Sequence, residues 1–231
     1  MARPTPLKTG ILMWDGVEMQ DWVGPYEVLC TATPLSVTDP ASLKYYFDPI
    51  TVALTPTVVC MGGVEVKMDR TCDAAGQLDV LVIPGGPRVL PVAGEPIPRW
   101  QQPLVDFIRT QAPGARVVAS VCTGAFLFAR TGLLDGLRAT THSGLLDVLQ
   151  QECDTYQRHV TVVPGKVEDN GGGRMVTASG VTSGIDFGLY LLNRFYGYRA
   201  MQQEAGYLDG PWPQWGDTGS FPPQGISGGG R

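Results

Sequence analysis

The sequence is poor in the residues that build metal sites and disulfide frameworks. It contains two histidines, His142 and His159, and five cysteines spread over 231 residues. No two cysteines form a Cys-x-x-Cys pair, and the spacing from Cys153 to His159 matches no zinc pattern. Because the number of cysteines is odd and their positions are scattered, we expect a reducing compartment and no disulfide framework. No structural or catalytic metal is expected.

Charge and long apolar runs are also scarce. Only 17% of the residues are charged, the net charge is −5, and Lys and Arg form no cluster, which argues against a nucleic-acid partner. No apolar run approaches the roughly 20 residues that a membrane span needs. Residues 1–10 lack the apolar centre of a signal peptide. We therefore expect a cytoplasmic protein without a membrane partner.

What the sequence does contain is an alternation of strand-like and helix-like segments. The continuous apolar runs 79–87 and 115–121 predict central parallel strands that are buried on both faces. Further strands are expected at 7–14, 45–54, 57–68, 137–142 and within 159–180, and helices at 19–32, 99–111, 123–131, 143–152, 181–197 and 199–206. Ser143 is the expected N-cap of helix 143–152, and Gly197 the expected end of helix 181–197. The alternation favours a mostly parallel sheet with helices on both faces.

The 43% of hydrophobic residues suits a single globular α/β domain. We assign residues 1–208 to that domain. Residues 209–231 are rich in Pro, Gly and Trp and are expected to form an extended or disordered C-terminal tail.

Cys122 comes at the point where a predicted central strand gives way to a helix. A strand followed at once by a helix forces a tight turn that presents its residue as a nucleophile elbow does, and Gly124 permits close packing there. Unpaired N–H groups at the helix start would stabilise a thiolate, so we expect a lowered pKa for Cys122. The alternative is a small buried packing residue, which is common for cysteine.

Two other predicted strands end in residues suited to the same site. Gly85 and Gly86 follow strand 79–87, where their backbone N–H groups could form an oxyanion hole. Asp21 begins the helix after the first strand, and partial burial there would raise its pKa and suit proton transfer. Asp21 could instead be a charge favoured at a helix start, and Glu18 and Glu27 are expected to be solvated. These segments meet where sites form in parallel sheets, at the carboxyl ends of the strands.

His142 has two interpretations. It could act as a base paired with Cys122, or it could bind backbone at the start of helix 143–152. We place it among the residues that contact substrate. Trp22 and Tyr26 on the first helix are available to form an apolar pocket.

Four segments together resemble the PfpI-like superfamily, which has the class I glutamine amidotransferase fold. They are DGVEMQDWVGPYEVL (15–29), DVLVIPGGP (79–87), VVASVCTGAFLFARTGLLDGLRATTH (117–142) and VTASGVTSGIDFGLYLL (176–192). The superfamily's triad-bearing branch needs a late His-x-Glu and its protease-like branch a His directly after the cysteine. The sequence has neither, because Ser-Gly follows His142, Val-Thr follows His159, and Thr123 follows Cys122.

Asp21 and the Cys122–Thr123 pair resemble most the branch that hydrates isonitriles. This resemblance implies a flavodoxin-like three-layer sandwich, usually a homodimer, in which Cys122, Asp21 and Thr123 are catalytic. The implied reaction converts a small isonitrile, R–N≡C, to an N-substituted formamide without a cofactor. On this hypothesis Cys122 forms a thioimidate and Asp21 is the acid and base.

Two other functions fit the same elbow. A non-enzymatic redox sensor would oxidise Cys122 to a sulfinic acid. Another cysteine-dependent enzyme of the superfamily, such as a glyoxalase or a hydrolase, would need a His or Glu partner, for which the sequence offers His142.

Overall fold

Seven strands form one sheet in the order β10-β11-β7-β6-β1-β2-β5, and all neighbours run parallel except β10 and β11. The structure is a computed structural model that describes residues 5–34, 45–92, 97–170 and 172–210. The strands are β1 (Leu7–Met13), β2 (Phe47–Ala53), β5 (Arg70–Thr71), β6 (Val80–Ile83), β7 (Val117–Val121), β10 (Val167–Glu168) and β11 (Met175–Ala178). The predicted mostly parallel sheet is thus confirmed.

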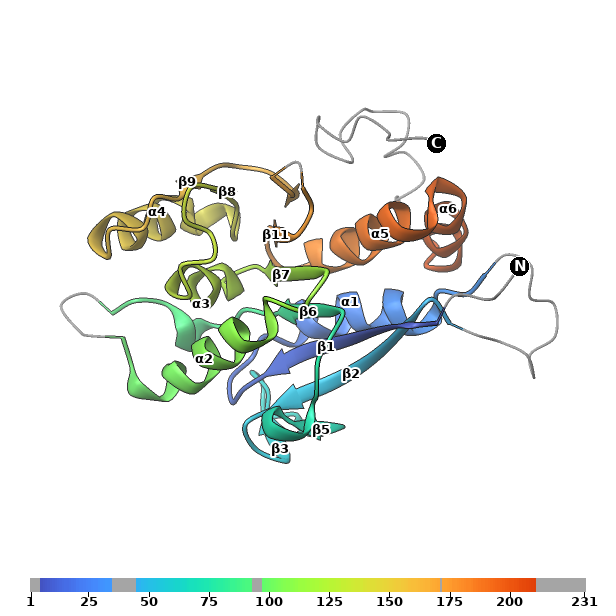
Figure 1. The fold of residues 1–231 in the computed structure, drawn as a ribbon, viewed down its shortest axis with the longest axis horizontal. Coiled ribbons are helices and arrows are strands. Elements are labelled where there is room, and N and C mark those ends of the chain that lie inside the picture. The colour runs from blue at the N-terminus through green and yellow to red at the C-terminus, as the bar shows by residue number, and fades with distance from the viewer. Residues whose placement is uncertain (1–4, 35–44, 93–96, 171, 211–231) are drawn as a thin grey trace.

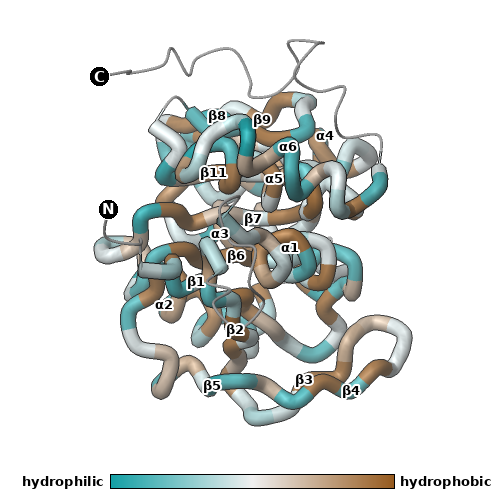
Figure 2. Tube along the Cα trace, turned by 90° about the vertical axis from the view of Figure 1, so that its right-hand side faces the viewer, coloured by the Kyte–Doolittle hydropathy of each residue, from teal (hydrophilic) through white to brown (hydrophobic). Residues whose placement is uncertain are grey.

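Helices cover both faces of this sheet, as the predicted three-layer sandwich requires. Helices α1 (Met19–Thr31), α5 (Ser183–Tyr196) and α6 (Tyr198–Tyr207) pack together on one face. Helices α2 (Gln102–Gln111) and α3 (Gly124–Arg130) lie on the other face, as Figures 1 and 2 show. Helix α4 (Leu146–Thr155) packs beside α3.

The two strands predicted to be central are buried throughout. Every residue of β6 and of β7 is buried, which explains why their sequences are continuously apolar rather than alternating. Two small strand pairs lie outside the main sheet. One is the antiparallel hairpin of β3 (Thr57–Val59) and β4 (Glu65–Lys67), and the other pairs β8 (Arg138–Ala139) with β9 (Thr161–Val162).

The strand order reverses between β1 and β6, which are neighbours in the sheet. From β1 the chain builds β2 and β5 on one side, and then returns through β6 to β7 and β11 on the other. Ligand sites of open parallel sheets lie at such a switch point, outside the carboxyl ends of the strands. Residues that follow β1, β6 and β7 therefore meet in one place.

The predicted cap of helix α4 is wrong. Helix α4 begins at Leu146, after a 3₁₀ turn of residues Ser143–Leu145, and Ser143 is not its N-cap. His142 caps the turn, because its Nδ1 accepts the Gly144 N–H (3.1 Å). The ring takes the place that the Ser143 hydroxyl was expected to fill. Gly197 does end α5, with a φ of 85° that favours glycine.

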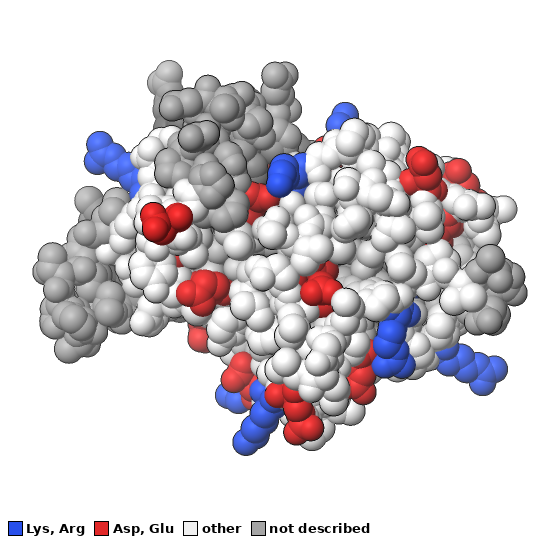
Figure 3. Space-filling view, turned by 180° about the vertical axis from the view of Figure 1, so that it is seen from behind, with Lys and Arg blue, Asp and Glu red and all other residues white. Residues whose placement is uncertain are grey.

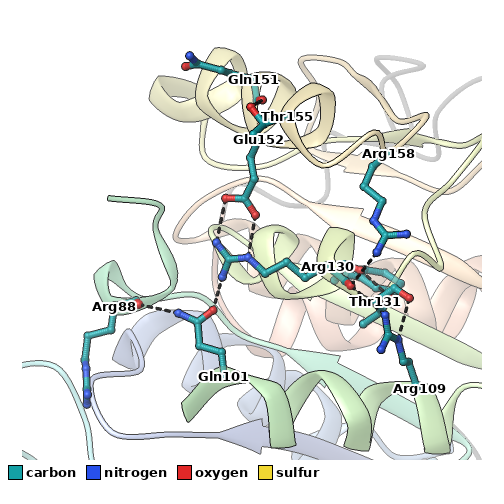
Figure 4. Close-up of polar contacts among 10 residues, drawn as sticks. Arg88, Gln101, Arg109, Arg130, Thr131, Gln151, Glu152, Thr155 and Arg158 are labelled. Atoms are coloured by element: carbon teal, nitrogen blue, oxygen red, sulfur yellow. Dashed lines mark hydrogen bonds and ion pairs between the residues drawn. The ribbon is translucent and has the colours of Figure 1, made fainter. Parts of the chain in front are cut away.

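A buried ion pair joins the far end of α3 to α4 (Figure 4). Arg130 donates to both carboxylate oxygens of Glu152, from Nε to Oε1 (2.7 Å) and from Nη2 to Oε2 (2.9 Å). Its Nη1 donates to Gln101, whose amide in turn donates to the Arg88 carbonyl (3.1 Å). Arg130 and Glu152 are 8% and 6% exposed, so the pair has little contact with water.

We expect Glu152→Ala to lower the free energy of unfolding by about 3–5 kcal/mol, because it leaves the Arg130 charge buried without its partner. Urea unfolding measures the loss. Asp135→Ala is the control, since it breaks the partly exposed pair between Arg158 and Asp135 (3.4 Å). That exposed pair is worth roughly 1 kcal/mol or less. Equal losses in the two variants would contradict the structural role of the buried pair.

The described surface shows charges of both signs. On the face in Figure 3, Lys and Arg side chains stand apart from one another among acidic and uncharged residues, outside the area covered by grey atoms. None of the helices in the described ranges is long and apolar enough to cross a membrane. The expected C-terminal tail lies outside the described residues from position 211 onward.

Candidate active site

Cys122 lies on the predicted elbow between β7 and α3. Its φ of 55° is in the left-handed region, which is uncommon for any residue but glycine. Three hydrogen bonds hold this backbone in place. The Cys122 N–H donates to the carbonyls of Ala178 (3.0 Å) and Ser179 (3.1 Å), and the Thr141 hydroxyl donates to the Cys122 carbonyl (2.8 Å). The strand–turn–helix geometry of a nucleophile elbow is therefore present.

Gly124 permits the close packing expected of it. A Cβ at this position would collide with the Ile83 carbonyl oxygen and stand 2.8 Å from that of Pro84. The start of α3 thus lies against the end of β6, and this contact brings Cys122 and Thr123 next to Gly85 and Gly86.

Asp21 is fully buried at the start of α1. Its Oδ2 accepts the Gly85 N–H (2.9 Å), and the Cys122 side chain lies beside its carboxyl group. Burial raises the pKa of Asp21 to about 7, although the Gly85 N–H and the Cys122 side chain oppose the shift. The predicted rise is confirmed, and the carboxyl can give or accept a proton near neutral pH.

The prediction of a lowered pKa for Cys122 is wrong. The residue is 6% exposed, and burial together with the negative charge of Asp21 raises its pKa to about 12. The Thr123 N–H faces the sulfur and favours the thiolate, but this effect is smaller. The helix start therefore does not outweigh desolvation. At neutral pH the sulfur is therefore a thiol beside the Asp21 carboxyl.

The N–H groups of Gly85 and Gly86, which were expected to form an oxyanion hole, instead donate to side chains of the site. The Gly85 N–H donates to Asp21, and the Gly86 N–H donates to the Thr123 hydroxyl oxygen (2.8 Å). Both amides are thus already engaged with side chains of the site and are not directed at a substrate. A Cβ on Gly85 would stand 2.6 Å from the Thr123 nitrogen and 2.7 Å from Asp21 Oδ2, so only glycine fits between them.

Thr123 joins the elbow to the turn after β6. Its hydroxyl donates to the Gly86 carbonyl (3.0 Å) while accepting the Gly86 N–H. Thr123 thus positions the two turns relative to each other, and its side chain also faces the Cys122 sulfur, where it favours the thiolate.

A cleft of about 400 Å³ opens above Cys122. It is lined by Glu18, Met61, Gly86, Pro87, Leu90, Cys122, Thr123, His142, Gly144, Leu145 and Val181. Most of these side chains are apolar, and they come from segments far apart in the chain. The cleft is large enough for a small organic substrate.

Trp22 and Tyr26 were expected to form the apolar pocket, but neither is among the described residues that line the cleft. Successive residues of a helix are turned by about 100°, so the face of α1 that carries Asp21 into the site directs Trp22 sideways. Trp22 instead packs edge-to-face on Tyr26, with ring centroids 6.2 Å apart.

His142 does line the cleft, with its tautomer set by backbone. Because Nδ1 accepts the Gly144 N–H, the neutral ring carries its proton on Nε2 and acts as a donor there. Gly180 separates this ring from the nucleophile. A Cβ on Gly180 would stand 2.5 Å from His142 Cδ2 and 3.1 Å from Cys122 Sγ.

We expect Gly180→Ala to lower the rate of a reaction at Cys122 by roughly 10²-fold. The added methyl group displaces the His142 ring and crowds the Cys122 sulfur, and a misplacement of about 1 Å in an active site can cost that much. Steady-state kinetics measure the loss. Gly144→Ala is the control, since a Cβ there would be 3.4 Å from His142 Nδ1, an ordinary contact. Equal activity in the Gly180 variant and the wild type would show that this spacing is not needed.

Several residues of the site were not predicted from the sequence, among them Glu18, Gly180 and Met61. Glu18 was expected to be solvated but is half-buried and lines the cleft, whereas Glu27 is exposed as expected. Gly180 follows β11, so the argument from the carboxyl ends of strands could have found it. Met61 sits in the turn of the β3–β4 hairpin, and no sequence signal points to it. Within the described ranges, no three His, Cys, Asp or Glu side chains gather as metal ligands would.

A parallel α/β sheet with a cysteine elbow at its switch point defines the class of proteins with the glutamine-amidotransferase-like fold. Within this class the chain belongs to the DJ-1/PfpI family, whose profile matches residues 8–194.

Known proteins support this assignment at two levels. The isonitrile hydratase of Pseudomonas putida is 33% identical over 196 residues, which cover 85% of this chain and 75% of that protein. A THiJ/PfpI family protein from Pseudomonas syringae has a similar structure, with a TM-score of 0.70 at 21% identity over 89% of this chain and 75% of the other. Oxidised DJ-1 of Toxoplasma gondii gives a TM-score of 0.68 at 20% identity over 89% of this chain and 100% of that one. The two structural likenesses show the fold.

Proposed function

We propose that the protein hydrates isonitriles, R–N≡C, to N-substituted formamides. The observation that carries this proposal is the position of the Cys122 thiol beside the buried Asp21 carboxyl at a mostly apolar cleft. Such a pair can deliver a sulfur and a proton to one carbon atom, which is what the addition requires. The similarity to the hydratase of Pseudomonas putida supports the same reaction.

In the first step, the Cys122 sulfur bonds to the isonitrile carbon and the thiol proton moves to that carbon through Asp21. The product is a thioimidate, R–N=CH–S–Cys122, and the Asp21 carboxylate is regenerated. Since the thiol proton has a carboxylate acceptor, the reaction needs no resting thiolate. This accommodates the raised pKa of Cys122.

In the second step, Asp21 takes a proton from a water that attacks the thioimidate carbon. The C–S bond then breaks, the nitrogen receives a proton, and the thiol is restored as the formamide R–NH–CHO leaves. A pKa of about 7 lets Asp21 serve as base and acid in turn.

His142 and Thr123 have different roles in this scheme. The Nε2–H of His142 donates a hydrogen bond to the oxygen that water adds to the thioimidate carbon. The Gly85 and Gly86 N–H groups do not take this role because they already donate to Asp21 and Thr123. Thr123 keeps the elbow in register with those glycines and acts as a positioning residue.

The raised pKa of Cys122 argues against the redox-sensor alternative, because peroxide oxidises thiolates.

The assay mixes purified protein with cyclohexyl isocyanide and follows N-cyclohexylformamide by liquid chromatography and mass spectrometry. We expect multiple turnovers, and a covalent isonitrile adduct on the Cys122 peptide after rapid acid quenching. If no formamide forms and dilute peroxide readily oxidises Cys122, the hydratase proposal is rejected in favour of the redox sensor.

A further inference from the structure

The lining of the cleft comes from several segments of the chain. The β3–β4 hairpin contacts the segment before α1, because the Met61 N–H donates to the Val17 carbonyl (2.8 Å), and Met61 and Glu18 both line the cleft. Leu145 and Val181 line it as well. A substituent R on a substrate bound at Cys122 must pack along these residues.

Among the described residues that line the cleft, Glu18 is the one Asp, Glu, Lys or Arg. Arg88 approaches the same segment, but its guanidinium donates to the Asp15 carbonyl (2.8 Å) and lies over the Trp100 ring, 4.9 Å from the centroid. The cleft therefore offers R apolar surface and a single carboxylate.

The backbone holds Glu18 close to the reacting groups. Its N–H donates to the Gly85 carbonyl (2.9 Å), and the Gly85 N–H in turn donates to Asp21. Electrostatic contact follows, since the charge of Glu18 contributes to the raised pKa of Asp21. An anionic group on R would meet this same charge in a partly desolvated cleft.

We propose that Glu18 is the specificity-determining residue of the site: it selects isonitriles whose substituent is apolar or carries a basic group, and it rejects those that carry a carboxylate or phosphate. This inference rests on the proposed function for the identity of the reacting group. The charge selection itself rests on the position of Glu18 in the cleft.

The first test compares two benzyl isonitriles of matched size, one with a para-aminomethyl group and one with a para-carboxylate. We expect kcat/KM to favour the basic compound by roughly tenfold, as one charge at such a range gives. Glu18→Gln should remove this preference, so that the ratio of the two kcat/KM values falls close to one. Glu18→Lys should invert the ratio. The control Glu27→Gln makes the same change on the exposed side of α1, about 13 Å further along the helix, and should leave the ratio unchanged.

The second test needs no isonitrile turnover. Cys122 is alkylated with iodoacetamide or with iodoacetate, and the Cys122 peptide is quantified by mass spectrometry, with rates normalised to 2-mercaptoethanol. We expect Glu18→Gln to raise the iodoacetate-to-iodoacetamide rate ratio by roughly tenfold and Glu27→Gln to leave it unchanged. Equal ratios in the two variants would overturn the selection by Glu18. A shifted alkylation ratio without any formamide would retain the charge selection and reject the hydratase.

Discussion

Cys122→Ala is expected to abolish formamide production, with a loss of roughly 10⁴–10⁶-fold, because no other atom of the site can form the thioimidate. The fold should persist. Alanine is strained at the positive φ of the elbow in the same way as cysteine. The hydrogen bonds that the Cys122 backbone makes with Ala178, Ser179 and Thr141 do not involve the sulfur. Formamide yield and the urea unfolding midpoint measure the two expectations.

The matched control is Cys153→Ala. Cys153 is also buried, but it lies on α4 and does not line the cleft. This variant should keep near wild-type turnover. Substantial formamide production by Cys122→Ala would mean that water adds to the isonitrile without a covalent intermediate.

Asp21→Asn is expected to lower turnover by about 10²–10⁴-fold, the range for loss of a general acid or base. The variant keeps an acceptor for the Gly85 N–H but can no longer relay a proton. The wild-type rate should change with pH around the Asp21 pKa of about 7, and that dependence should disappear from the residual activity of the variant. Steady-state kinetics from pH 5 to pH 9 test both expectations.

The same variant should be more stable than the wild type at neutral pH and above. Below pH 3.8 the carboxyl is protonated in both the folded and the unfolded chain, so its ionisation costs nothing. Between about pH 4 and 7 the unfolded chain ionises first, and the wild-type free energy of unfolding falls as the pH rises. Above about pH 7 the full cost applies, at most about 4 kcal/mol for a shift of this size.

Asp21→Asn removes that cost, so the stability difference between variant and wild type should grow from about pH 4 to 7 and then level off. Asp186→Asn is the control. Asp186 is another buried carboxyl whose pKa is raised, but it is paired with Lys166 (3.5 Å) and does not line the cleft. That variant should retain turnover. A wild-type protein more stable than Asp21→Asn at pH 8 would contradict the buried, shifted carboxyl.

The features that follow from local sequence were predictable. The apolar runs of β6 and β7 specified buried strands, and the strand–turn–helix pattern placed Cys122 on an elbow. The carboxyl ends of parallel strands then brought Asp21, Gly85 and Cys122 together. Each of these inferences depends on a short segment and on the geometry of parallel sheets alone.

The features that depend on contacts between distant segments could not be predicted from the sequence. The Cys122 pKa is set by burial and by Asp21, which lies about 100 residues earlier in the chain. The Gly86 N–H is taken by the Thr123 hydroxyl, a pairing that only the docking of α3 against β6 creates. Glu18 and Met61 line the same cleft because the β3–β4 hairpin contacts the segment before α1, where the Met61 N–H donates to the Val17 carbonyl. Hydrophobic periodicity carries no information on such pairings.

The left-handed backbone at position 122 favours glycine for folding stability, whereas the proposed reaction needs a cysteine there. Glycine adopts a φ of 55° without the steric cost that every other residue meets there, roughly 1 kcal/mol. A chain under selection for folding alone would therefore drift toward glycine at position 122. The strained side chain at position 122 lowers folding stability relative to glycine, so the value of its sulfur lies in chemistry and not in folding.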